Sequence, residues 1–291
     1  MFEFKPLELR DKDLINKYFS KSNYINAEKN FSNLFMWRKC YNYEFCEINH
    51  SLFIRGITKD NIRFYHFPYS DSYEKSVKIL AQIVEWDTAD KIIIKPILPE
   101  MKEYLEKFHL DFEVNEDRDS FDYIYSSEKL HSLKGKHLRS KRRWVKKFID
   151  NYEYTYENIT IENINLAKKF TLNIIKNTNN DSNELIAMTE MFDHFFDLDI
   201  QGCVIKVDDE IIGVSTGEPL GSDSVIIHCE RCNTDYEGIY NFINFKFIEE
   251  EWKEYEYINR EEDLGIEGLR YAKLSYQPIN LLKKYICVLS F

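Results

Sequence analysis

Glycine and proline are scarce in this chain of 291 residues, which contains nine glycines and six prolines. Collagen-like repeats and low-complexity linkers need far more of both residues, so these classes are excluded. Aromatic residues are plentiful instead, with 20 Tyr and 21 Phe, and 44% of the chain is hydrophobic. The composition therefore predicts a folded protein with substantial cores and enough length for two domains.

Long apolar runs are also missing. No segment reaches the length of a transmembrane helix, and the opening MFEFKPLELRDKD lacks the basic and then apolar order of a signal peptide. The six cysteines are scattered, and the Cys229–Cys232 spacing has neither a second pair nor a histidine at zinc-site distance. We expect a soluble, cytoplasmic protein with reduced thiols and no metal site, and peripheral membrane contact stays open.

A formal net charge of −11 argues against general affinity for nucleic acids or membranes, but one segment has the opposite sign. Residues 134–148 (KGKHLRSKRRWVKKF) contain eight cations and no acid. A helical wheel places Leu138, Val145, Phe148 and Ile149 on one face, which should pack against the domain. The remaining faces predict a polyanion contact, the alternative being a solvated helix that pairs with acidic residues elsewhere. The cations expected to bind the polyanion are Lys136, Arg139, Arg143, Lys146 and Lys147.

Helical and strand patterns alternate in both halves of the chain, which predicts an α/β layer structure. The segment SSEKLHSLKG lacks apolar periodicity and marks the boundary between the halves. We therefore predict an N-terminal domain of residues 1–128 and a C-terminal domain of residues 129–291.

Seven of the nine glycines follow residue 200, so the candidate site is sought in the last third of the chain. A hairpin turned at 208–210 is followed by strand, helix, strand, helix and strand. This order resembles the core of the GNAT acyltransferase fold, in which two central strands splay apart.

The closing stretch, residues 259–278 (NREEDLGIEGLRYAKLSYQP), has a chemical interpretation of its own. Gly265 and Gly268 allow a tight turn, and Arg270 and Lys273 at i, i+3 should face one way and bind an anion together. Asp263, at the end of a strand, could hold an ammonium group. An amine and a phosphate in one site would fit the aminoacyl ester of an RNA 3′ end, whereas the alternative is a turn held by a local Asp–Arg bridge.

The same stretch resembles the closing motif of the phosphatidylglycerol lysyltransferase C-terminal family, and the basic segment also resembles that family. The matching residues are Asn259, Asp263, Leu264, Gly265, Gly268, Leu269, Arg270, Lys273 and Pro278. The resemblance implies two tandem GNAT-like domains, each a mixed, mostly antiparallel sheet flanked by helices, as in the Fem-type aminoacyl transferases. It also implies transfer of an aminoacyl group from aminoacyl-tRNA, bound by its 3′ end, to an amine or hydroxyl acceptor, without a resident cofactor.

Site roles follow from this resemblance. Asp263, Arg270 and Lys273 are expected at the catalytic centre, with His228 and Glu230 as the nearest candidates for a base. Strand alternation would put His228 and Glu230 on one face, although the alternative, a satisfied core histidine, is the favoured explanation of His228. The residues expected to bind substrate are Asn259, Gly265, Gly268 and Arg231. The resemblance further implies that the polyanion bound by Lys136, Arg139, Arg143, Lys146 and Lys147 is tRNA.

Two other functions stay open, a CoA-dependent N-acyltransferase and a non-catalytic RNA-binding protein. The segment NTDYEGIYNF contains Gly238 alone and lacks the glycine-rich pyrophosphate loop of CoA-using GNAT enzymes, which makes CoA the weaker donor. This sequence does not include the membrane-embedded half of the lipid-modifying synthases, which makes phosphatidylglycerol a weaker expectation for the acceptor. The acceptor, whether a lipid, a small molecule or a peptide, is therefore unknown.

Overall fold

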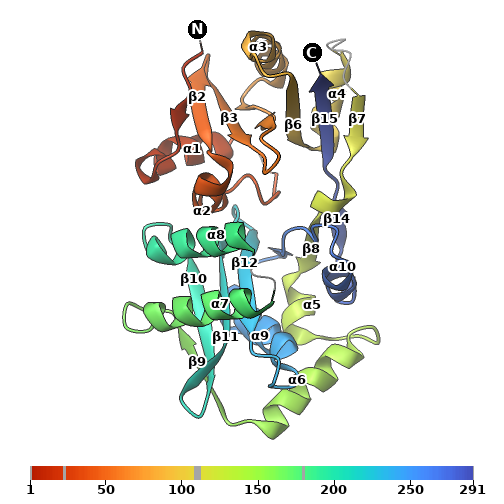
Figure 1. Cartoon of the computed structure of the whole chain (residues 1–291). Helices are drawn as coiled ribbons and strands as arrows, with labels where there is room; N and C mark the ends of the chain where they lie inside the picture. The colour runs from red at the N-terminus through yellow and green to blue at the C-terminus, as the bar shows by residue number, and fades with distance from the viewer. Residues whose placement is uncertain (1, 22–23, 108–112, 179–180, 291) are drawn as a thin grey trace. The chain divides into compact units, whose positions relative to one another are not determined.

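The computed structural model describes residues 2–21, 24–107, 113–178 and 181–290, and the chain divides into two compact units (Figure 1). Unit 1 consists of residues 1–24, 28–121 and 282–291, and unit 2 consists of residues 25–27 and 122–281. Each unit contains one mixed, mostly antiparallel sheet flanked by helices, which confirms the expected fold class.

Unit 1 is built around a sheet with the strand order β1-β2-β3-β4-β6-β15-β7, and β5 pairs with β3. Among the described residues, neighbouring strands of this sheet are antiparallel except for β4 and β6, which are parallel. The elements are β1 (Lys5–Pro6), η1 (Leu9–Asp11), α1 (Lys12–Phe19), α2 (Phe31–Tyr41), β2 (Glu44–Ile48), β3 (Ser51–Ile57), β4 (Arg63–Tyr65), β5 (Tyr69–Ser70), α3 (Tyr73–Trp86), β6 (Lys91–Ile97), α4 (Pro99–Lys107), β7 (Glu113–Glu116), η2 (Arg118–Ser120) and β15 (Tyr285–Ser290).

Unit 2 has a sheet with the order β14-β8-β13-β12-β11-β10-β9, in which β12 and β13 are parallel. The elements are β8 (Asp122–Ser126), α5 (Ser127–Ser132), α6 (Arg139–Asn151), β9 (Tyr154–Asn158), α7 (Ile164–Thr178), α8 (Ser182–Asp193), β10 (Gln201–Val207), β11 (Glu210–Pro219), β12 (Ser224–Cys232), α9 (Ile239–Phe247), the π-helical turn η3 (Ile248–Trp252), β13 (Tyr257–Asn259), α10 (Glu267–Leu274) and β14 (Asn280–Leu282).

The sequence placed β8 in the N-terminal domain and β15 in the C-terminal domain, but the structure places each strand in the sheet of the other unit. β15, at the end of the chain, inserts between β6 and β7 of unit 1, and β8 pairs with β13 in unit 2. The expected division at 128/129 had placed these two strands the other way round. The reason is physical: backbone hydrogen bonds assign a strand to a sheet, and these bonds join segments far apart in the sequence.

Local sequence explains the hairpin of unit 2. β10 and β11 are joined by Asp208 and Asp209, which adopt φ values of 50° and 65°. Aspartate tolerates the left-handed conformation that a two-residue hairpin turn requires. The turn therefore lies where the sequence predicts it.

The two faces of the unit 2 sheet are covered by different helices. α7 and α8 lie over one face of β10 to β12, and α9 lies behind the sheet in the view of Figure 1. Core residues of α9, such as Phe242 and Ile243, pack with strand residues and with Val145 and Phe148 of α6 in one hydrophobic cluster. None of the described helices combines the length and the apolarity that crossing a bilayer requires.

Candidate functional site

The sheet of unit 2 opens between its two parallel strands. β12 and β13 are paired at three positions, the last of which joins Ile226 to Asn259. Beyond this point β12 continues, whereas the chain leaves β13 through Arg260 and Glu261. Side chains of the two diverging segments form ion pairs with each other. The residues of this split network are Glu218, His228, Glu230, Arg260 and Glu261.

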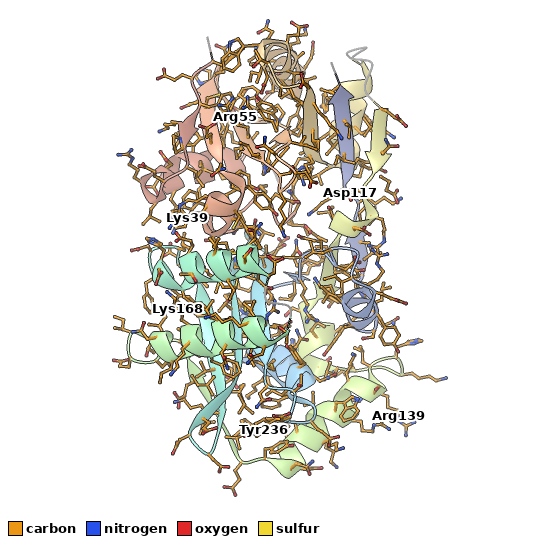
Figure 2. The ribbon with its side chains drawn as sticks, in the orientation of Figure 1. Lys39, Arg55, Asp117, Arg139, Lys168 and Tyr236 are labelled. Atoms are coloured by element: carbon orange, nitrogen blue, oxygen red, sulfur yellow. The ribbon has the colours of Figure 1, made fainter. Side chains whose placement is uncertain are left out.

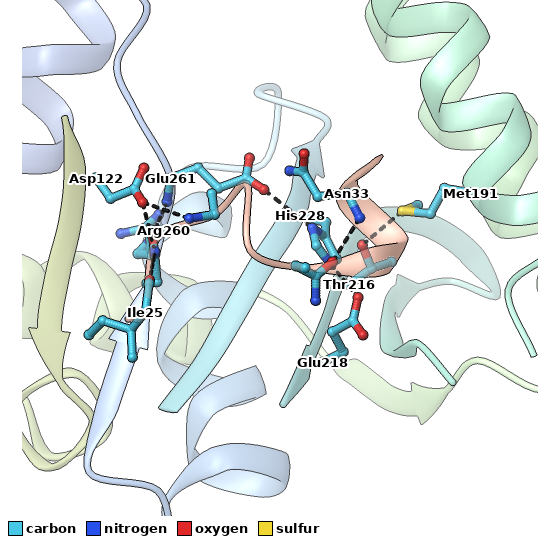
Figure 3. Close-up of polar contacts among 12 residues, drawn as sticks. Ile25, Asn33, Asp122, Met191, Thr216, Glu218, His228, Arg260 and Glu261 are labelled. Carbon is cyan, nitrogen blue, oxygen red and sulfur yellow. Dashed lines mark hydrogen bonds and ion pairs between the residues drawn. The ribbon is translucent and has the colours of Figure 1, made fainter. Parts of the chain in front are cut away.

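His228 lies between two carboxylates (Figure 3). Its Nε2 is 2.8 Å from Oε1 of Glu218, and its Nδ1 is 3.2 Å from Oε1 of Glu261. Burial by itself lowers the pKa of His228, but the two carboxylates outweigh burial and raise this pKa to about 9. The imidazole is therefore protonated at neutral pH, and this trio carries a net charge of −1.

A β-bulge presents His228. Thr216 of β11 pairs with Cys229, and the next residue of β11, Gly217, pairs with Ile227. His228 is thus the extra residue on β12, without an opposite partner. Bulges of this kind turn a side chain away from the simple alternation of a strand.

The expectation that His228 and Glu230 share one face is wrong for this reason. Glu230 accepts a hydrogen bond of 3.0 Å from Nδ2 of Asn244 on α9, behind the sheet. His228 contacts Glu218, which lies two residues after Thr216, and the hydroxyl of Thr216 contacts α8. The two candidate bases consequently face opposite sides of the sheet.

Glu230 and Arg260 form the second ion pair of the split network. The guanidinium of Arg260 lies against two aromatic rings, with centroid distances of 5.7 Å for Tyr125 and 5.0 Å for Tyr276. Burial disfavours the cation, but Glu230 more than compensates and the pKa of Arg260 is raised. Glu230 is therefore engaged by a permanent cation and by an amide.

Asp263 is completely buried and fully engaged. It accepts hydrogen bonds from Nε and Nη2 of Arg270 at 2.9 and 2.7 Å, from the hydroxyl of Tyr123 at 2.5 Å and from the main-chain N–H of Gly265 at 2.9 Å. Burial raises its pKa, but Arg270 and the other donors outweigh this effect and hold the pKa well below its usual range. These contacts match the alternative interpretation, a turn held by a local Asp–Arg bridge.

Lys273 is the one buried residue among those described in α10. Its ammonium donates to the carbonyl of Arg260 at 2.6 Å, to that of Glu261 at 3.2 Å and to that of Glu262. Burial is the main cause that lowers its pKa. Lys273 and Arg270 do not bind one anion together, as the sequence suggested, because their ends have different partners. Lys273 instead fixes the loop that carries Arg260 and Glu261 into the split network.

The other residues expected to bind substrate are placed as follows. Asn259 is buried and donates to the carbonyl of Ile25 at 2.7 Å and to Asp122 at 3.1 Å. Arg231 forms an ion pair with Glu184 of α8. Both residues connect elements of unit 2.

The two glycines of the closing stretch differ from each other. Gly265 has a φ of 71°, which glycine adopts without strain, and its N–H binds Asp263. A Cβ at Gly268 would meet nothing within 4 Å, so the fold does not require glycine there. Neighbouring apolar side chains are exposed: Leu264 at 65% and Tyr271 at 77%.

The basic segment forms α6, which begins at Arg139, with Lys136 in the preceding loop. Lys147 pairs with Glu237, whereas Arg139, Arg143 and Lys146 line an open groove of about 900 Å³. Arg139 projects away from the ribbon (Figure 2). Leu138, Val145 and Phe148 are buried as predicted. The prediction for Ile149 is wrong, because this side chain is 45% exposed and lines the groove.

α6 also covers the N-terminus of α9. Gly238 caps α9 with a φ of 88°, and a Cβ on this residue would lie 2.4 Å from the carbonyl oxygen of Trp144 in α6. The rings of Phe148 and Phe242 stack at 4.4 Å beside this contact. A helix N-terminus binds phosphates through free N–H groups, and here the approach to that end is filled by a packed helix.

Sequence analysis missed Glu218, Arg260 and Glu261. Strand alternation along β11 predicts that Glu218 and Thr216 share a face. No local pattern, however, predicts the bulge in β12 that turns His228 toward Glu218. Arg260 and Glu261 belong to the closing stretch, but its motif of glycines and following cations pointed to Asp263, Arg270 and Lys273 instead. Their importance depends on β13, whose neighbours come from distant segments.

Comparisons with known proteins agree with this fold. Residues 20–288 match the family model described as phosphatidylglycerol lysyltransferase, C-terminal. The chain is 26% identical over 213 residues to the uncharacterized protein MYCGA3080 of Mycoplasmoides gallisepticum, covering 72% of this chain and 68% of that protein.

Among solved structures, a conserved protein of unknown function from Bacteroides thetaiotaomicron is similar over 100% of both chains, with 31% identity and a TM-score of 0.92. A C-terminal domain assigned to a lysylphosphatidylglycerol synthetase from Agrobacterium fabrum has 13% identity and a TM-score of 0.70, over 96% of this chain and 91% of that one. FemX and a tandem GNAT protein from the clavulanic acid pathway share the fold, with TM-scores of 0.62 and 0.52, identities of 11% and 6%, and coverage of at least 96% of each chain.

Proposed function

Because this chain belongs to the phosphatidylglycerol lysyltransferase C-terminal family, we propose that it is an aminoacyltransferase that uses aminoacyl-tRNA as its donor. An acceptor amine or hydroxyl attacks the ester carbonyl, the new C–N or C–O bond forms, and the ester C–O bond to the RNA breaks. The proton of the acceptor is finally carried by the released 3′ hydroxyl. The ester is already activated, so the main task of the protein is to align the two reactants.

The observation that supports this proposal is the acidic character of the split network. Glu218, His228 and Glu261 together carry one net negative charge in a largely buried position. The Glu261 side chain is 21% exposed, against 12% for Glu218 and 0% for His228. Glu261 is therefore the carboxylate that a substrate ammonium reaches first, and the α-ammonium of an aminoacyl ester has the complementary charge.

In this scheme the roles differ from those expected from the sequence. Glu261 replaces Asp263 as the partner of the ammonium, because Asp263 is saturated by Arg270 and Tyr123. His228 is already protonated at neutral pH, so it orients the two carboxylates and does not accept the proton of the acceptor. Lys273 positions the loop that carries Glu261.

A CoA-dependent acyltransferase is disfavoured by the contact between α6 and α9. The diphosphate of CoA would need the N–H groups at the start of α9, and the backbone of Trp144 packs there against Gly238. A non-catalytic RNA-binding protein is the second candidate, since the cations of α6 lie apart from the split network and could bind RNA without turnover.

The test compares binding of one tRNA in its aminoacylated and deacylated forms. We expect the charged form to bind about tenfold more tightly, equivalent to about 1.4 kcal/mol, because it adds an ammonium–carboxylate contact. The Glu261→Gln variant should lose this preference. Glu267→Gln, which changes an exposed carboxylate in α10, is the matched control and should keep it.

Three outcomes separate the candidates. Equal binding of both tRNA forms by the unmodified protein contradicts the transferase proposal and favours the RNA-binding protein. Binding of acetyl-CoA with indifference to tRNA favours the CoA-dependent enzyme. Preference for charged tRNA that survives in Glu261→Gln would remove Glu261 from its assigned role.

A further inference from the structure

The groove on α6 combines cations with an apolar floor. It has a volume of about 900 Å³ and lies between the end of α5, one side of α6 and α9. It thus lies entirely within unit 2. Its lining residues used below are Leu133, Arg139, Arg143, Lys146, Ile149 and Phe245.

Three of these cations are available to a ligand. Among the residues that the structure describes, no carboxylate forms an ion pair with Arg139, Arg143 or Lys146. Arg142, by contrast, donates to the main-chain carbonyls of Leu133 and Gly135 and so holds the groove wall in place. The three available cations follow one side of α6 over seven residues, about 10 Å along the helix axis. A row of cations of this length can contact successive phosphates of a single nucleic-acid strand.

The floor of the groove offers a surface for a flat, apolar ring. Ile149 is 45% exposed although it belongs to an amphipathic helix, and Phe245 of α9 is only partly buried beside it. Leu133 and Val145, which are buried, also line the groove. An aromatic ring beside free cations is the arrangement on which single-stranded nucleic acids bind, with bases on the ring and phosphates on the cations.

We propose that this groove binds the unpaired nucleotides that precede the esterified 3′ end of the tRNA, an inference that rests on the proposed tRNA donor. A duplex presents only its phosphates to such a helix and would gain nothing from Ile149 and Phe245. A phospholipid acyl chain needs a long apolar surface, whereas the floor exposes one aliphatic side chain and part of one ring. An unpaired base with its phosphates matches both parts of the groove.

One contact of α6, made outside the groove, leads toward the Glu230–Arg260 pair of the split network. Lys141, on the same helix, lies 4.0 Å from the ring centroid of Tyr276, and the guanidinium of Arg260 lies 5.0 Å from the same centroid. Arg260 in turn pairs with Glu230. The groove is thus linked through packed side chains to the Glu230–Arg260 pair, which lies on the side of the sheet that α9 covers.

The experiment measures binding of two deacylated RNA hairpins that differ only by a four-nucleotide 3′ overhang. We expect the overhang to strengthen binding to the full chain by about tenfold, since stacking of one base has this order of effect. Phe245→Leu keeps the apolar volume without the ring and should remove most of this advantage, whereas Phe245→Tyr should retain it. Ile149→Gln, at an exposed helix position, should reduce it without affecting folding, as thermal unfolding will check.

Charge is tested with the same RNAs. Arg143→Ala should weaken both hairpins and lower the slope of log affinity against log salt by about 1, because one phosphate contact is lost. Lys176→Ala, at the exposed end of α7, is the control and should leave the slope unchanged.

The proposal is overturned if both hairpins bind equally, or if Phe245→Leu and Ile149→Gln keep the full effect of the overhang. Binding to vesicles of anionic phospholipid that is lost in Ile149→Gln would assign the groove to a lipid instead. All RNAs here are deacylated, so failure of this proposal leaves the preference for charged tRNA, and with it the proposed transferase, to be judged separately.

Discussion

The sheets of the two units share one arrangement and place a histidine at comparable points. In unit 1 the parallel strands β4 and β6 pair through Tyr65 and Ile94, and His66 is the next residue after β4. In unit 2 the parallel strands β12 and β13 pair through Ile226 and Asn259, and His228 follows two residues later. Both histidines are buried, yet their chemistry is opposite.

His66 is surrounded mainly by rings. Tyr43, Phe64 and Tyr69 have ring centroids 5.7, 6.0 and 6.4 Å from its imidazole. Burial lowers the pKa of His66 to about 4, an effect that the field of Glu28 only partly offsets. His66 is therefore neutral at pH 7 and acts as a core residue of unit 1.

His228 has carboxylates where His66 has rings, and its pKa is raised to about 9. The comparison teaches that position in the sheet does not decide the role of a buried histidine. Side chains contributed by other segments decide it, here Glu218 from β11 and Glu261 from the loop after β13.

The largest effect is expected from His228→Leu. This change leaves the carboxylates of Glu218 and Glu261 close together without the cation between them, which should cost about 3–5 kcal/mol of unfolding free energy. Urea unfolding at pH 7 measures the loss. His137→Leu, at an exposed loop position, should change stability by less than about 0.5 kcal/mol. A loss below about 1 kcal/mol in His228→Leu would mean that the network carries little net energy.

A smaller effect is expected from Glu218→Gln, which removes one of the two carboxylates. The pKa of His228, followed by NMR titration of its ring protons, should fall by about 1–2 units. The folded pKa is raised above the unfolded value, so the contribution of His228 to stability is present below pH 6.5 and is lost as pH rises through about 9. The variant should lose this contribution at a lower pH. An unchanged pKa of His228 would show that Glu261 alone keeps this imidazole protonated at neutral pH.

The smallest effect, confined to acid, is expected from His66→Phe. Below pH 6.5 the unfolded chain protonates this histidine while the folded protein does not until about pH 4, so the native protein loses stability as pH falls through this window. The variant should not show this loss. The difference in unfolding free energy between variant and parent should therefore be about 1–2 kcal/mol more favourable to the variant at pH 5 than at pH 8. Equal differences at both pH values would refute the neutral state of His66.

Structural features that depend only on residues close together in the sequence were predicted correctly. The hairpin turn at Asp208 and Asp209 follows from residues that tolerate a left-handed backbone, and the amphipathic pattern of α6 predicted burial of Val145 and Phe148. The sequence also singled out the closing stretch and predicted that Asp263, Arg270 and Lys273 bind the substrate. In the structure these side chains bind each other or the main chain of the loop. Asp263, Arg270 and Lys273 fold the loop, and Glu261 within that loop is the residue presented to the split network.

The sequence by itself determined the fold class, the presence of two similar sheets and the placing of eight cations on one short segment, because hydrophobic period, turn residues and charge are properties of neighbours along the chain. Only the tertiary structure decided which strand completes which sheet, that a bulge turns His228 toward Glu218, and that Ile149 stays open beside Phe245. These features arise from hydrogen bonds and contacts between residues far apart in the sequence, and no local pattern encodes such pairings.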